Sequence, residues 1–172
     1  MNALFHTATA IGVAVMLTDT KKMELTTSAK PITITSIFAF IVGIISHAAL
    51  DYIPHCYPIN SKLDVILGSL LIGIMLWFAN KKYRLILALS FLGCIFPDLI
   101  DLLPSIINKQ FGLNMPTTNK IFPWHFPSYS GSIYNNNCSA STINQTLLIC
   151  TICIVCWFRQ TDFKVMFAKK LK

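Results

Sequence analysis

Residues 32–52 read ITITSIFAFIVGIISHAALDY, an apolar run whose only histidine and only carboxylate, His47 and Asp51, lie near its end. At about 1.5 Å per residue, a helix of this length extends about 30 Å, which matches the hydrocarbon core of a bilayer. Pro54 closes the run, because proline lacks an amide donor and disfavours helical angles at the residue before it. The run therefore predicts a membrane-spanning helix.

Four further apolar runs flank this stretch, and we expect all five to form one helical membrane domain covering residues 1–172. They are residues 4–18, 63–79, 85–107 and 143–158, with a polar outer loop at 108–142. The composition agrees, since 54% of the residues are hydrophobic and 12% are charged, against about 25% charged in soluble domains. The sequence thus predicts an all-α, polytopic integral membrane protein with about five transmembrane helices. The first run lacks a basic leading segment, so we expect a retained helix and not a signal peptide.

The distribution of cations predicts the orientation. Of the 14 lysines and arginines, 11 fall in alternate connections or in the tail: Lys21, Lys22, Lys30, Lys81, Lys82, Arg84, Arg159, Lys164, Lys169, Lys170 and Lys172. By the positive-inside rule, we expect the N-terminus outside the cell membrane and the C-terminus in the cytoplasm. The net charge of +7 comes from these clusters and not from a basic stripe, so the expected partner is the lipid bilayer and not a nucleic acid.

This orientation places all four histidines on the outer side, together with three aspartates. The set is His6, His47, Asp51, His55, Asp98, Asp101 and His125. His47 and Asp51 are spaced i, i+4, and Asp98 and Asp101 are spaced i, i+3, so each pair projects from one side of its helix. The spacing therefore allows two helices to direct nitrogen and oxygen ligands at a common point.

The negative charge of these aspartates, together with the histidine nitrogens, favours a bound metal ion. A carboxylate at membrane depth costs about 2.5 to 3.5 kcal/mol on insertion scales, so three of them need a compensating charge or a wet cavity. Mixed histidine and aspartate ligands suit zinc, and also manganese or iron. A single histidine or aspartate at this depth is often a hydrogen bond between helices, and that alternative stays open for each residue alone. For the whole set, the sequence predicts a divalent metal site, with zinc as the expected ion.

Two further residue groups allow more than one interpretation. Trp124, beside His125, suits an aromatic belt at the membrane interface or the wall of an amphiphile's binding site. The six cysteines lie mostly within or beside apolar runs, where cysteine behaves as a small hydrophobic residue. They do not fix a redox compartment.

An early His6, the run Ser-His-Ala-Ala-Leu-Asp at 46–51 and the run Phe-Pro-Asp-Leu-Ile-Asp at 96–101 resemble the bacterial membrane-bound metal-dependent hydrolase family. The resemblance covers roughly residues 1–130 and implies metal-dependent hydrolysis of an undefined substrate. It marks His6, His47, Asp51, Asp98 and Asp101 as metal-site candidates, while His55 and His125 are candidates by position. The order of the two runs is the reverse of the family's, and the family's His-Arg-Gly-x-x-His run is absent unless Trp124-His125 takes its place.

These residues favour a membrane-embedded hydrolase acting on an ester or phosphoester at the outer face. We expect His6, His47 and Asp51 to bind the metal, with Asp98 and Asp101 as catalytic residues, either as further ligands or as the general base. A site at membrane depth suggests a lipid-linked substrate. Two other classes stay open: a transporter of protons or divalent cations, and a metal-stabilised membrane protein without catalysis.

Overall fold

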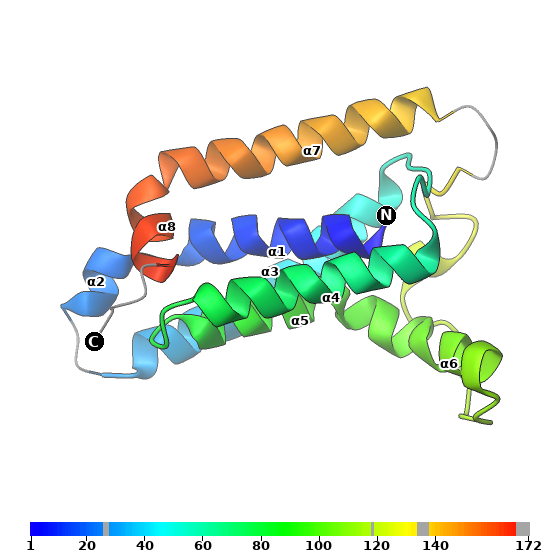
Figure 1. Ribbon diagram of the computed structural model, residues 1–172, viewed down its shortest axis with the longest axis horizontal. Helices are drawn as coiled ribbons and strands as arrows, with labels where there is room; N and C mark the ends of the chain where they lie inside the picture. Colours follow the sequence, from blue (N-terminus) through cyan, green and yellow to red (C-terminus); the bar gives the residue numbers. More distant parts are fainter. Residues whose placement is uncertain (26–27, 118, 134–137, 168–172) are drawn as a thin grey trace.

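The computed structural model describes residues 1–25, 28–117, 119–133 and 138–167, and in this part of the chain all regular structure is helical. The helices are α1 (Ala3–Leu17), α2 (Thr20–Glu24), α3 (Lys30–Tyr52), α4 (Ser61–Phe78), α5 (Arg84–Asp101), α6 (Leu103–Phe111), the 3-10 helix η1 (Pro123–His125), α7 (Ser139–Phe158) and α8 (Gln160–Phe167). The helices α1, α3, α4, α5 and α7 alternate in direction along the bundle (Figure 1). The predicted tail cations Lys169, Lys170 and Lys172 lie outside the described residues.

Three helices, α3, α4 and α7, are long and apolar enough to cross a membrane, and the α5–α6 pair qualifies as a fourth, broken span. This number is smaller than the five predicted. The predicted helix at 85–107 is in fact two helices, bent by 57° where α5 ends. Pro104 lies in the first turn of α6, where its missing amide donor is tolerated, whereas the same residue would interrupt a continuous helix.

The helix α1 differs most from its expected role. Its 15 residues extend only about 22 Å, which is less than a bilayer core. It packs against α3, α4, α5 and α7 and buries Ala10 and Ala14 completely. Asp64 of α4 accepts hydrogen bonds from the amides of Ala3 and Leu4, at 2.8 and 3.0 Å, and so satisfies free donors at the start of α1. The helix α1 is therefore the centre of the bundle in the described structure.

The helices α3 and α5 cross at two glycines. A Cβ atom on Gly93 would lie 2.2 Å from the carbonyl oxygen of Phe40, and one on Gly43 would lie 2.8 Å from the amide nitrogen of Cys94. Only glycine permits this approach of two backbones. The crossing lies one helical turn before His47, so it sets the position of that side chain relative to α5.

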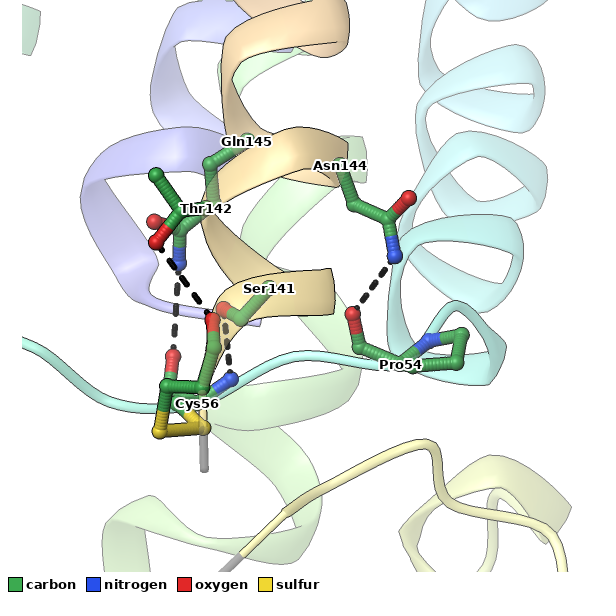
Figure 2. Close-up of a disulfide and its surroundings, with 7 residues drawn as sticks. Pro54, Cys56, Ser141, Thr142, Asn144 and Gln145 are labelled. Carbon is green, nitrogen blue, oxygen red and sulfur yellow. Dashed lines mark hydrogen bonds between the residues drawn. A yellow bond between two sulfur atoms is a disulfide. The ribbon is translucent and has the colours of Figure 1, made fainter. Parts of the chain in front are cut away.

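A disulfide between Cys56 and Cys138 joins the connection after α3 to the start of α7, with the two Cα atoms 5.8 Å apart. Polar residues of α7 bind the same connection (Figure 2). Ser141 accepts a hydrogen bond from the Cys56 amide at 2.7 Å, and Asn144 donates one to the Pro54 carbonyl at 2.8 Å. These contacts hold α7 against the end of the bundle where the histidines gather.

We predict that Gly93→Ala destabilises the protein by about 1 to 3 kcal/mol, because the added methyl group overlaps the backbone of α3. Gly73→Ala on α4 is the matched control, since its Cβ would meet nothing within 4 Å. Unfolding of the purified protein in mixed micelles measures both variants. Equal stability of the two variants would contradict the close crossing of α3 and α5.

Candidate metal centre

Four side chains from three separate parts of the chain converge at one end of the bundle. His47 and Asp51 come from α3, Asp98 from α5 and His125 from η1, and one ligand atom of each lies within 4.8 Å of the others. The helical spacing of His47 and Asp51 brings them together, whereas His125 arrives from a segment more than 20 residues beyond α5. The structure thus assembles four of the seven residues that the sequence predicted as ligands.

The distances between these atoms fit one small ion. The Nε2 atoms of His47 and His125 are 3.3 Å apart. From the carboxylate oxygens of Asp51 and Asp98, the His47 nitrogen lies at 3.2 and 3.6 Å, and the His125 nitrogen at 3.4 and 3.3 Å. A tetrahedron whose corners lie about 2.0 to 2.1 Å from its centre, as for zinc, has edges of about 3.3 to 3.4 Å. The five distances that involve an imidazole nitrogen, 3.2 to 3.6 Å, are close to these edges, and the two carboxylate oxygens lie within 4.8 Å of each other.

Both imidazoles are oriented through their other nitrogen. His47 Nδ1 donates to the carbonyl of Cys94 at 2.7 Å, and His125 Nδ1 donates to the carboxylate of Asp101 at 2.8 Å. Because a carbonyl only accepts, Nδ1 of His47 carries a proton, and in the neutral ring Nε2 then has the lone pair that a metal ion requires. Metal-binding histidines are commonly held in this way by a carboxylate or a backbone carbonyl. The two rings are therefore positioned as metal ligands.

Asp101 also anchors the segment that carries His125. Its carboxylate accepts hydrogen bonds from the amides of Ile121 and Phe122, at 2.9 and 3.0 Å, and its side chain is fully buried. The sequence predicted Asp101 as a ligand or general base. The structure places it behind His125, where it orients the ring.

His6 lies beside the four-residue group. Its ring stacks on that of His47, with centroids 3.9 Å apart, and its Nε2 lies 3.1 Å from the Oδ1 atom of Asp51. Asp51 faces His47 and His125 through its other oxygen, Oδ2. His6 therefore positions the Asp51 carboxylate.

His55 belongs to a different hydrogen-bond network. Its Nδ1 donates to the carbonyl of Ile53 at 2.8 Å, and its Nε2 lies 3.1 Å from the Tyr57 hydroxyl and 3.2 Å from the Ser132 hydroxyl. Burial lowers the pKa of His55 from its usual value, so the ring is neutral at pH 7. Gly131 brings this network close to the metal group, because its amide donates to the carbonyl of Asp51 at 2.8 Å.

The electrostatics of the group favour a cation. Burial alone would lower the pKa of His125, but hydrogen bonds to Asp51, Asp98 and Asp101 outweigh this and raise it to about 10. Three carboxylates around one imidazole thus hold a proton against the cost of burial. A divalent ion at the same place would neutralise more of the carboxylates' negative charge than one proton does.

A cavity of about 370 Å³ opens onto the group, and its lining includes Asp51, Asp98 and His125. This volume lies within the range of pockets that bind small molecules. Asp98 is the most accessible of the four, with 26% of its side chain exposed, whereas His47 is fully buried. Trp124 also lines the cavity.

No family model, curated protein or solved structure matches this chain. The fold and the site alone define the class: an all-helical protein with apolar helices suited to a membrane and a histidine–aspartate group able to hold a metal ion.

We predict that Asp101→Asn weakens metal binding about 10- to 100-fold, because an amide holds the proton-bearing His125 nitrogen less strongly than a carboxylate does. Asp19→Asn is the control, since asparagine replaces aspartate well at the start of a helix and Asp19 caps α2. Competition with a chelating dye measures the affinity. Equal affinities of the two variants would contradict the role assigned to Asp101.

Proposed function

We propose that this protein is a membrane-embedded, metal-dependent hydrolase that cleaves an ester or phosphoester. One observation carries the proposal: two imidazole nitrogens and two carboxylate oxygens lie within 4.8 Å of one another at the wall of a substrate-sized cavity. The proposal also agrees with the resemblance of residues 46–51 and 96–101, which include three of these ligands, to membrane-bound metal-dependent hydrolases. Zinc is the proposed ion, since it prefers these ligands.

The four proposed ligands would hold the ion unequally. His47, Asp51 and His125 are almost fully buried, whereas 26% of the Asp98 side chain is exposed. Catalytic zinc sites usually have three protein ligands and one position for water or substrate. We assign Asp98 to the exchangeable position, so that its carboxylate is free to accept a proton when substrate enters.

The bound ion would act as a Lewis acid on the substrate oxygen and would lower the pKa of a nearby water. Asp98 would take a proton from this water as it attacks the carbonyl carbon or the phosphorus. The bond to the leaving alcohol oxygen then breaks, and Asp98 returns the proton to that oxygen. One water molecule is consumed, and one acid and one alcohol are formed.

We predict that the purified protein contains about one zinc per chain, and that His125→Ala abolishes both metal content and hydrolysis. Asp98→Asn should retain most of the metal, held by the other three ligands. Its hydrolysis should fall at least about 100-fold, because the amide cannot accept a proton. Elemental analysis and hydrolysis of nitrophenyl esters and phosphodiesters measure these outcomes.

Three results would overturn parts of this proposal. Wild-type protein without stoichiometric metal would refute the metal site. Metal without hydrolysis of either substrate class would leave a structural metal protein. Asp98→Asn protein with full activity would remove Asp98 from the reaction. Asp19→Asn protein serves as the control throughout, since Asp19 caps α2 at the opposite end of the bundle (Figure 1).

We also propose that the metal site faces the outside of the cell membrane. The Cys56–Cys138 disulfide lies at the same end of the bundle as the proposed metal site, and disulfides persist in oxidising compartments outside the cytoplasm. The cations of α2, α8 and the connection between α4 and α5 lie at the other end, as the positive-inside rule requires of cytoplasmic segments.

We predict that a membrane-impermeant maleimide labels Asn114→Cys protein in intact cells and does not label Lys81→Cys protein. Asn114 follows α6, which projects from the end of the bundle that contains the proposed metal site, and Lys81 lies in the connection between α4 and α5 at the other end (Figure 1). The unmodified chain is the background, since its free cysteines, Cys94, Cys150, Cys153 and Cys156, lie within helices. Labelling of Lys81→Cys protein alone would reverse the proposed orientation.

A further inference from the structure

The cavity beside the proposed metal site has two chemically different walls. One wall is apolar and comes from the candidate membrane helices α4 and α5 together with α6. Its apolar residues include Val65, Ile72, Ile95, Leu99, Ile106 and, between α5 and α6, Leu102. The other wall is polar and lies on the loop side, with Lys120, Tyr57, Ser130 and Ser132. Asp98 and His125 line the same cavity, so an occupant of it would reach the metal ligands.

The charged groups of the cavity favour an anion once the metal is bound. The acidic side chains that line it are Asp51, Asp64 and Asp98. Asp64 is occupied by the first amides of α1, and the other two are proposed ligands whose charge a divalent ion would neutralise. Lys120 then remains as the cationic side chain of the lining.

Lys120 is held next to the metal ligands. Its ammonium group donates to the carbonyl of His125, with a nitrogen–oxygen distance of 2.6 Å. An ammonium group has three donors, so this bond fixes the position of the charge and leaves donors for a ligand. The hydroxyls of Ser130 and Ser132 hydrogen-bond to each other at 2.8 Å, and Ser132 also contacts Tyr57 at 2.9 Å. All four residues line the cavity, and their ammonium and hydroxyl groups are donors suited to phosphate oxygens.

We infer that the substrate is a lipid phosphoester, with its phosphate between the metal and Lys120 and its hydrocarbon chain along the apolar wall. The inference rests on the hydrolase function proposed above and narrows it to one substrate class. A lipid is the occupant because the apolar wall is built from helices suited to a bilayer. Its hydrocarbon chain would match the apolar wall, and its phosphate would match the polar residues. A soluble phosphoester would match only the polar residues.

Two phosphodiesters that differ only in chain length test this inference: hexadecyl nitrophenyl phosphate and ethyl nitrophenyl phosphate. Both release the same nitrophenolate, so a difference between them reports binding of the chain. We expect wild-type protein in nanodiscs to show a kcat/KM at least about tenfold higher for the hexadecyl substrate, since buried methylene groups each add affinity. Equal kcat/KM values would overturn the inference and leave the hydrolase function standing.

Val65→Trp and Ile66→Trp form a matched pair for the apolar wall. The two residues are neighbours on α4 with exposed fractions of 54% and 55%, but only Val65 lines this cavity. We expect Val65→Trp to remove the chain-length preference and Ile66→Trp to keep it. Loss of the preference in both variants, or in neither, would contradict the proposed path of the chain.

Lys120→Gln tests the phosphate site, with the exposed Lys109→Gln as control. Loss of a hydrogen bond to a charged group should raise KM about tenfold for both phosphodiesters with little change in kcat, and leave nitrophenyl carboxylic esters unaffected. Equal losses on both ester classes would contradict the inference.

Calorimetry of hexadecyl phosphate binding to the metal-loaded protein tests this inference separately from the hydrolase function. Binding that weakens in both Val65→Trp and Lys120→Gln would support the lipid site even without turnover. Absence of binding would overturn it whether or not turnover occurs.

Discussion

Ionised carboxylates are costly inside an apolar helix bundle, and the end of this bundle contains three of them around a single imidazole. Asp51, Asp98 and Asp101 all contact His125 through distances of 2.8 to 3.4 Å. Such a concentration of negative charge persists only if protons or a cation compensate it. The positions of α3, α5 and the segment before α7 can be understood as the arrangement that brings histidines, and through them a metal ion, to these carboxylates.

The backbone contacts that hold the bundle together also orient the proposed ligands. The glycine crossing of α3 and α5 brings the Cys94 carbonyl to 2.7 Å from the His47 ring. Asp101 binds two backbone amides and His125 with the same carboxylate, so the path of the chain and the direction of the imidazole depend on one side chain. Gly131 has a similar double role, since it binds the end of α3 where a Cβ atom would lie 2.4 Å from the carbonyl of Ile53. The contacts that stabilise the bundle therefore also position the proposed metal ligands.

Apolar run length and proline positions predicted most of the helices, because burial in lipid requires long apolar stretches whatever the tertiary contacts. They also predicted that α1 crosses the membrane, whereas this helix is short and its apolar residues pack at the centre of the bundle. They also missed the bend between α5 and α6. Helical spacing predicted the pairing of His47 with Asp51. The separate roles of Asp98 and Asp101 depend on how residues 112–133 return to α5, and no periodicity in that segment encodes the path. The same holds for the position of His55 and for the Cys56–Cys138 disulfide, which a count of six cysteines leaves undetermined.

The difference in burial among the four proposed ligands distinguishes a catalytic site from a structural one. A purely structural metal site is most stable when its four ligands are equally buried and each is held by a further hydrogen bond. His47 and His125 meet that description, and Asp51 is held by His6 as well. Asp98 differs, because it lies one residue after the proline in α5 and keeps 26% of its side chain exposed, at a cavity of about 370 Å³ that Asp51 and His125 also line. An exposed ligand would be able to exchange with substrate while three buried ligands held the ion, and this asymmetry favours the proposed chemistry over a purely structural role.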